Sequence, residues 1–254
     1  MGRLRAWLED FGRMIFFAGE MLAWLVRPPW RPELVLGQMA AIGVGSTFIV
    51  ATTGFFTGMV FALQVNYAMR QFGAEGYVGG SVGVSLAREL GPVLTALMVI
   101  GRSGSAIATE IGTMRVTEQI DAMETMAVNP VQYLAVPRFV AALAMFPVLT
   151  MVFNGVGYAG AYLMGIFVAE IPAGPFIEHT RTFVEPTDIV HGLYKSIIFG
   201  GVVALITSYR GYAAEPAGGS KGVGEGTTRA VVMSSIAVLV VDYAVTLVTV
   251  GSGR

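Results

Sequence analysis

The sequence predicts an all-α integral membrane protein, and two observations support this fold class. The chain of 254 residues is 54% hydrophobic and only 13% charged, with a mean hydropathy of +0.67. Its apolar residues form runs long enough to cross the hydrocarbon core of a bilayer, which takes about 20 helical residues. We expect an amphipathic helix at the N-terminus, about five transmembrane helices, and a short cytoplasmic helix between the second and the third.

Residues 1–30 are predicted to form an amphipathic helix that lies in the membrane interface. Glu9 and Asp10 interrupt the apolar run that a signal peptide would need, so we interpret the segment as a retained helix. Trp7 and Trp24 are suited to anchor it at the headgroup level. A helix packed against the rest of the protein is the alternative. The apolar residues at helical spacing are Leu4, Leu8, Phe11, Ile15, Ala18, Leu22 and Leu25.

Residues 31–254 form the predicted transmembrane domain. No charged residue occurs in residues 34–69, a run that exceeds one straight crossing and must therefore tilt, bend or protrude. Three regions connect the crossings: the charged stretch 105–130, the loop 170–188 and the glycine-rich stretch 210–229, which we expect to be a flexible loop. The five predicted crossings are residues 34–69, 77–101, 139–169, 189–209 and 230–250.

The distribution of basic residues predicts the orientation. Segments on the side of the N-terminus are rich in Lys and Arg, which marks the cytoplasmic side. The N-terminus is therefore predicted inside and the C-terminus outside. The basic residues assigned inside are Arg3, Arg5, Arg13, Arg27, Arg31, Arg102, Arg115, Arg138, Arg210, Lys221 and Arg229, against Arg70, Arg181 and Arg254 outside.

The stretch from Gly112 to Pro130 is charged, helix-forming and predicted to be cytoplasmic. One apolar stripe follows helical spacing, and Asn129-Pro130 ends the helix because proline disfavours helix in the residue before it. Such a helix is suited to a groove of a soluble partner; a plain connection at the interface is the alternative. The apolar stripe is Val116, Ile120, Met123 and Ala127, and the charged face is Arg115, Glu118, Asp121 and Glu124.

Charges inside crossings need partners or water because each is costly in a bilayer. Arg88 and Glu89 lie in the second crossing, where Pro92 removes a backbone hydrogen bond and predicts a kink with a free acceptor. They are expected beside a lipid headgroup or a water-filled vestibule, or in a buried structural network. Lys195 and Asp242 are expected to form an ion pair between the fourth and fifth crossings. A structural role is favoured for this pair, with a proton relay as the alternative.

The end of the first crossing offers a surface for a lipid. Phe55, Met59 and Leu63 share one helix face, and Tyr67 lies near its outer end. Ordinary packing is the alternative, and which face points inward stays open at this stage. Small residues at GxxxG spacing, Gly54 with Gly58 and Gly79 with Gly83, indicate close helix packing, either between two copies of the chain or within one.

Residues 86–138 resemble the signature region of the MlaE/YrbE permeases, the membrane subunits of ABC-type lipid transporters associated with MCE proteins. The stretch reads LARELGPVLTALMVIGRSGSAIATEIGTMRVTEQIDAMETMAVNPVQYLAVPR, and the likeness extends to RAVVMSSIAVLVVDYAVT and by general pattern to residues 35–250. The resemblance implies that the chain works as a homodimer in the bacterial inner membrane and moves phospholipid or a related lipid between the inner and outer membranes. Its implied partners are two cytoplasmic ATPase subunits, a hexameric periplasmic MCE protein and a small accessory subunit on the ATPase.

The resemblance also implies residue roles. The lipid-binding set is Phe55, Met59, Leu63, Tyr67, Glu89 and Leu90. The charged stretch becomes the coupling helix that docks onto the ATPase, through Glu110, Gly112, Arg115, Glu118, Gln119, Asp121, Met123 and Glu124.

Several function classes are not favoured. The chain has no GxxxxGK[ST], and AGGSKGVGEG lacks the phosphate-loop spacing, so ATP and magnesium are expected in the partner ATPase and no cofactor in this chain. No catalytic grouping emerges, and with no cysteine and only two histidines, neither catalysis nor a metal site is expected. A net charge of −1 gives no attraction to nucleic acid. Permeases for a sterol, a fatty acid or another hydrophobic substrate are the alternative, and a secondary carrier is less favoured because no internal repeat is visible.

Overall fold

The computed structural model describes the backbone of residues 2–29 and 31–252 and the side chains of residues 8–29 and 31–249. The predictions for Arg3, Leu4, Arg5, Trp7 and Arg254 therefore lie outside the described side chains. Within the described range all regular structure is helical, and five helices are long and apolar enough to cross a membrane. The all-α membrane fold and the five crossings are confirmed. The chain is a multi-pass membrane protein.

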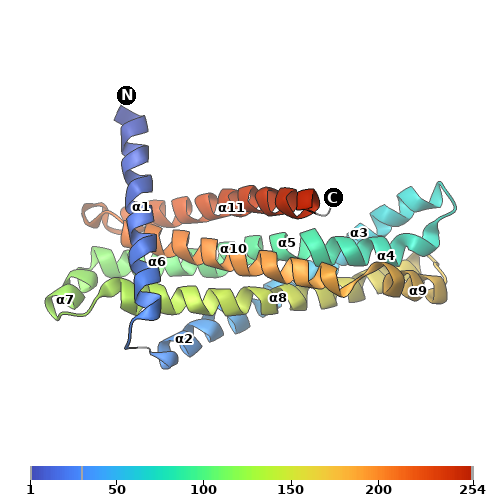
Figure 1. Ribbon diagram of the computed structural model, residues 1–254, viewed down its shortest axis with the longest axis horizontal. Coiled ribbons are helices and arrows are strands. Elements are labelled where there is room, and N and C mark those ends of the chain that lie inside the picture. The colour runs from blue at the N-terminus through green and yellow to red at the C-terminus, as the bar shows by residue number, and fades with distance from the viewer. Residues whose placement is uncertain (1, 30, 253–254) are drawn as a thin grey trace.

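The five crossings run side by side along the long axis of the molecule (Figure 1). The second, third and fifth extend well beyond the predicted ranges, because helical structure continues past the apolar core. Several contain π-helical turns, in which one extra residue bends the helix. The first crossing consists of α2 (Pro32–Met39), a π-helical turn (Ala40–Val44) and α3 (Gly45–Arg70), and the second of a 3-10 turn (Glu75–Tyr77), α4 (Val78–Ser85), a π-helical turn (Leu86–Leu90), α5 (Gly91–Val99), a π-helical turn (Ile100–Gly104) and α6 (Ser105–Val116). The third consists of a π-helical turn (Val131–Ala135), α8 (Val136–Leu163) and a π-helical turn (Met164–Val168). The fourth is α10 (Pro186–Tyr212), and the fifth is a 3-10 turn (Pro216–Gly218) followed by α11 (Gly219–Ser252).

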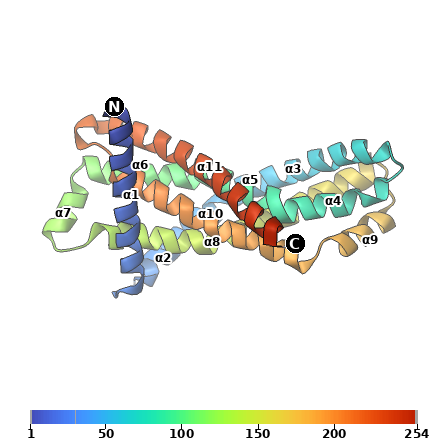
Figure 2. The same cartoon turned by 45° about the horizontal axis from the view of Figure 1, so that its top comes forward.

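The N-terminal helix α1 (Gly2–Val26) lies across the bundle near the end that carries α7 (Gln119–Thr125), as Figures 1 and 2 both show. One side of α1 exposes large apolar residues, among them Ile15 (56% exposed) and Leu22 (52% exposed). Its other side buries Phe17 and Met21 against the bundle. The exposed apolar face fits the predicted interfacial helix, and the buried face fits the alternative of a helix packed against the protein. The placement of α1 in a membrane interface stays a prediction.

Glycines set the closest helix contacts. Gly54 and Gly58 of α3 lie directly on the α8 backbone, where a Cβ on Gly58 would overlap the carbonyl oxygen of Gly157. Gly79 and Gly83 of α4 instead face α9 (Ala173–Phe183) and the residue after it; a Cβ on Gly79 would lie 2.6 Å from Thr180 Oγ1. Both GxxxG pairs are therefore used for packing within one chain.

Two predicted connecting regions are more ordered than expected. The stretch 210–229 was expected to be a flexible loop, which is wrong: α10 continues to Tyr212, α11 begins at Gly219, and only the short segment 213–218 connects them. The glycines are tolerated in this helix because it packs on α6, where Thr227 and Thr109 are joined by a 2.9 Å hydrogen bond between their hydroxyls. The loop 170–188 contains α9 and the start of α10.

Candidate functional site

A cluster of charged side chains lies inside the bundle, where α10 and α11 meet the π-helical turn Leu86–Leu90. The ammonium group of Lys195, on α10, is almost fully buried, with its side chain 1% exposed. It donates to Glu89, to Asp242 Oδ1 at 2.9 Å and to Thr246 Oγ1 at 2.7 Å. We call these four residues the lysine cluster. The expected ion pair between Lys195 and Asp242 is present, and the structure adds Glu89 and Thr246 to it.

The backbone around Pro92 brings Glu89 to this position. Because Pro92 has no N–H, the regular helical hydrogen bond to the Arg88 carbonyl is lost. The chain resolves this with a π-helical turn, in which the Gly91 N–H bonds to the Leu86 carbonyl five residues back. A free acceptor and a kink were expected here, and a π-helical turn is what the structure contains. Gly192 of α10 lies on this turn, where a Cβ would overlap the Ala87 carbonyl oxygen, so α10 approaches closely enough for Lys195 to reach Glu89.

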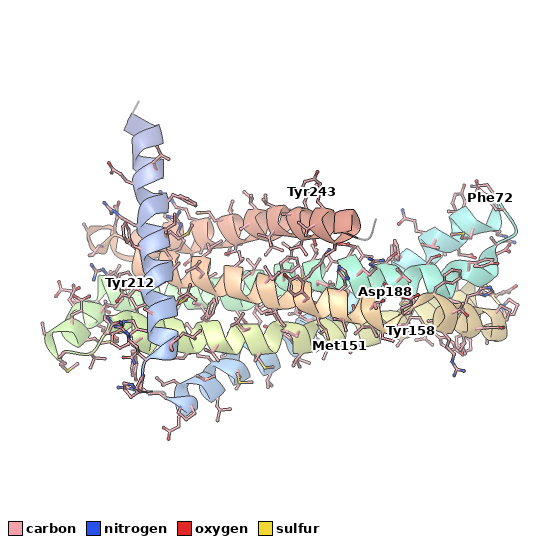
Figure 3. All side chains as sticks on the ribbon, in the orientation of Figure 1. Phe72, Met151, Tyr158, Asp188, Tyr212 and Tyr243 are labelled. Carbon is pink, nitrogen blue, oxygen red and sulfur yellow. The ribbon has the colours of Figure 1, made fainter. Side chains whose placement is uncertain are left out.

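Arg88 points to a different partner from its neighbour Glu89. Its guanidinium lies 3.5 Å from Asp188 Oδ1, and its side chain is 42% exposed. Asp188, labelled in Figure 3 near the start of α10, also accepts a hydrogen bond from the Glu185 N–H and so caps that helix. The two adjacent charges thus have different partners, because successive residues of a helix point in different directions. Glu89 belongs to the lysine cluster, and Arg88 contacts the start of α10.

The lysine cluster is partly open. The Glu89 side chain is 43% exposed and that of Asp242 is 21% exposed, while Lys195 is sealed beneath them. Two carboxylates surround one ammonium, so the cluster presents negative charge and acceptor oxygens toward its open side. Such a site can offer a polar contact to a headgroup or to water in an otherwise apolar region.

The predicted lipid-binding face of α3 is only partly exposed. Gly54 and Gly58 turn one side of α3 onto α8, so the opposite side faces outward. Leu63 is 45% exposed and Tyr67 74% exposed, whereas Phe55 and Met59 are half-buried. Leu90 is also half-buried and packs on the core. The exposed stripe on α3 is Phe56, Val60, Leu63 and Tyr67. It shares Leu63 and Tyr67 with the predicted set and has Phe56 and Val60 in place of Phe55 and Met59.

The predicted coupling helix is interrupted. The stretch from Gly112 was expected to continue as one helix, but α6 ends at Val116 and α7 starts at Gln119, with Glu118 in a left-handed conformation (φ 60°). Ile120 is fully buried and Met123 half-buried, as the apolar stripe predicts. Ala127 is exposed and lies beyond the end of α7, which corrects that part of the stripe.

The polar residues of this region divide into two groups. Glu118 and Gln119 are exposed at the tip, as a docking surface requires. The others hold the tip in place: Arg115 contacts Asp121 Oδ1 at 2.5 Å, and Glu110 pairs with the buried Arg138 at 2.8 Å. Gly112 was predicted to take part in docking, but it is buried beneath the segment that joins α10 to α11 and is therefore not at the surface.

Tyr212, at the end of α10, lies where α1 crosses the bundle (Figure 3). Its hydroxyl donates to Glu124 Oε1 at 3.2 Å, and its ring lies 5.6 Å from the Phe17 ring and 5.6 Å from the Arg115 guanidinium. This one side chain therefore contacts α1, α6 and α7 together. No periodicity pointed to it, because its partners come from two distant parts of the chain, near residue 17 and within residues 115–124.

Asp10 attaches α1 to the bundle. It accepts hydrogen bonds from Tyr209 at 2.7 Å and from Arg210 at 2.6 Å. Burial alone would raise the pKa of Asp10, but these two hydrogen bonds and the charges of Arg210 and Arg13 outweigh it and lower the pKa below 3.8. The sequence showed Asp10 only as an interruption of an apolar run.

Within residues 8–29 and 31–249, no group of three or more His, Asp or Glu side chains is placed to hold a metal ion. Thr246 could have been found from the sequence, because it lies one helical turn after Asp242 on the same face. Asp188 carried no such signal.

Comparison with known proteins identifies what the chain is similar to. A family model described as Permease MlaE matches residues 35–248. A probable ABC transporter permease protein of Rickettsia conorii is 40% identical over 94% of this chain and 91% of its own length. The intermembrane phospholipid transport system permease protein MlaE of Haemophilus influenzae is 39% identical over 96% of this chain and 95% of its own. The chloroplastic protein TRIGALACTOSYLDIACYLGLYCEROL 1 of Arabidopsis thaliana is 34% identical over 89% of this chain and 64% of its own.

Proposed function

We propose that this chain, which belongs to the MlaE permease family, is the membrane subunit of an ABC transporter that moves phospholipid or a related lipid between the inner and outer membranes of a bacterium. The observation that carries the proposal is the extent of the match to the phospholipid permease of Haemophilus influenzae, which spans 96% of this chain. The family model, which matches residues 35–248, spans the positions of the lysine cluster and α7. We also propose a non-catalytic role for this chain, with ATP and magnesium bound by a separate ATPase.

We assign the polar contact to the lipid to the lysine cluster. Glu89 and Asp242 are partly exposed beside the buried Lys195, so they offer acceptors to the ammonium or hydroxyl groups of a headgroup. The exposed stripe of α3, from Phe56 to Tyr67, offers the apolar contact for acyl chains. Five crossings make a thin wall around a cavity of lipid size, which favours a homodimer with the lipid between two copies.

We assign ATPase docking to the tip formed by Glu118 and α7. The end of the bundle that carries α7 also carries α1 (Figure 1), and the excess of Lys and Arg on this side favours a cytoplasmic location. The N-terminus is then cytoplasmic and, after five crossings, the C-terminus periplasmic. At the other end, α9 and the loop before it face the periplasm, where a hexameric MCE protein would bind. A small accessory subunit would bind the ATPase rather than this chain.

The test is quantitative affinity purification of the tagged protein from native membranes in mild detergent. We expect an ATPase with a phosphate-binding loop and an MCE-domain protein in stoichiometric amounts, with phospholipid in the extracted lipid fraction. Glu118→Lys should release the ATPase, because Glu118 is exposed at the tip and its reversal changes no buried contact. Glu178→Lys, at the opposite end of the molecule, is the matched control and should keep the ATPase. Recovery of the intact permease without any ATPase would refute the proposal.

A further inference from the structure

A groove with a volume of about 740 Å³ lies at the corner where the end of α1, the start of α2 and the start of α8 meet. Figure 1 shows this corner, with α1 ending beside the start of α2. The volume is within the range of small-molecule sites, about 300–1,000 Å³. The groove is separate from the lysine cluster, and its lining contains none of the residues of the exposed α3 stripe. The residues that line it are mainly apolar, among them Trp24, Leu25, Val35, Leu36, Val136 and Val140.

Arg31 lines this groove, and Arg27 lies beside it, next to the lining residue Trp24. The Arg31 guanidinium lies 4.9 Å from the centre of the Tyr133 ring, and that of Arg27 lies 5.9 Å from the Trp24 ring. Both arginines are exposed, and neither is within ion-pair distance of a carboxylate among the described side chains. A guanidinium held over an aromatic ring keeps its N–H groups free at the edge, where they can bind a phosphate in a bidentate manner.

The groove lies at the start of the first crossing, where we expect lipid headgroups. The first crossing starts at Pro32, directly after the bordering Arg31. The helix α1, which lies across the bundle, supplies Trp24, an aromatic residue of the type enriched at membrane interfaces. A phosphate at the arginines would therefore lie at the membrane surface, and an acyl chain would run along α2 and α8 toward the bilayer centre.

We propose that this groove binds an anionic phospholipid that is not the transported one, with one acyl chain between α1, α2 and α8 and the phosphate at Arg27 and Arg31. The apolar lining requires a hydrocarbon occupant, and the two positive charges at its border select a negative headgroup. A lipid in this position joins α1 to the first crossing and to α8. It is therefore a structural lipid that holds α1 against the bundle. This site does not depend on the proposed transport function.

The test is photolabelling of the full chain reconstituted in vesicles. The probe is a phosphatidylglycerol with a photoreactive group in one acyl chain, compared with a phosphatidylcholine carrying the same group, and the labelled peptides are identified by mass spectrometry. We expect label from phosphatidylglycerol on residues 136–143 of α8. Leu36→Trp should remove it, because Leu36 is 63% exposed and a larger side chain there fills the groove without entering the core. Phe48→Trp, at a site on α3 that is 82% exposed, is the matched control.

The headgroup is tested separately. In the wild type, phosphatidylglycerol should label on the order of tenfold more than phosphatidylcholine. Both lipids carry the phosphate, but the quaternary ammonium of phosphatidylcholine cancels its charge and is repelled by Arg27 and Arg31, and tenfold corresponds to about 1.4 kcal/mol. The double variant Arg27→Ala/Arg31→Ala should lose this preference, whereas Arg70→Ala, an exposed arginine on α3, should keep it. All variants are checked for wild-type helical content by circular dichroism.

Three outcomes would overturn the proposal. Undiminished labelling in Leu36→Trp would place the lipid elsewhere. Equal labelling by the two probes in the wild type would show that the site does not select an anionic headgroup. Absence of label from residues 136–143 with either probe would show that lipid does not enter the groove. The experiment needs no ATPase and no MCE protein, so its result is independent of whether the transport proposal holds.

Discussion

Replacing Lys195 by methionine should destabilise the protein, because it removes the only positive charge in the lysine cluster and keeps a side chain of similar length. Removing one partner of a buried ion pair costs about 3–5 kcal/mol, since the other partner stays buried without compensation. Here the carboxylates left behind are 43% and 21% exposed, so water solvates them in part and we expect a loss of about 2–3 kcal/mol.

This loss is measurable by thermal unfolding of the purified protein in detergent, followed by far-UV circular dichroism. At about 2–4 °C per kcal/mol for a chain of this size, the midpoint should fall by about 4–12 °C. Lys221→Met is the control, because that side chain is 85% exposed and its replacement should leave the midpoint nearly unchanged.

A series of neutral variants tests whether the cluster acts as a unit. Lys195→Met/Asp242→Asn should recover part of the stability, and addition of Glu89→Gln should recover more, because all three charges are then removed together. The double variant keeps Glu89 charged and unpaired, which limits its rescue. An unchanged midpoint in Lys195→Met, or a triple variant no more stable than the single one, would refute the reasoning.

Two further predictions concern the packing of α3 and the attachment of α1. Gly58→Ala should destabilise the protein by about 1–3 kcal/mol or prevent its folding, because the new Cβ overlaps the Gly157 carbonyl oxygen; Gly155→Ala, with no neighbouring atom within 4 Å, is the control in the same thermal assay. Asp10→Asn should loosen α1 by removing the charge that faces Arg210, and fluorescence reports this directly, since the three tryptophans of the chain all lie in residues 1–30. The pKa of Asp10 is lowered in the folded state, so its contribution is complete above pH 3.8 and is lost as the pH falls through the lowered value. Wild type should therefore approach the fluorescence of Asp10→Asn only in acid, and a wild-type spectrum that matches the variant at neutral pH would contradict this role.

Much of the fold could be predicted from local composition. The crossings follow from runs of apolar residues, because the bilayer requires a continuous helix wherever the chain passes through it. Gly54 and Gly58 indicated close packing, since only small residues allow two helix backbones to touch. The burial of Ile120 and Met123 followed from their spacing.

The ends of the helices were harder to predict. Residues 219–229 are helical despite their glycines because α6 packs against them, and this contact is not visible in their own sequence. The break at Glu118 has no glycine or proline to mark it. The break lies between α6 and α7, and α7 buries Ile120 in the core. The position of the break therefore depends on a tertiary contact of Ile120.

The sequence by itself determined that this is a membrane protein with five crossings, because hydrophobicity and its period are local properties of the chain. It also showed that Lys195 and Asp242 need partners, since a buried charge is costly wherever it lies. Only the tertiary structure decided which partners they have. Glu89 joins the cluster because a π-helical turn before Pro92 lies against Gly192 of another crossing, and Tyr212 joins α1 to α7 because three separate helices meet at its ring. Such contacts depend on how distant segments approach in space, which no local pattern in the sequence encodes.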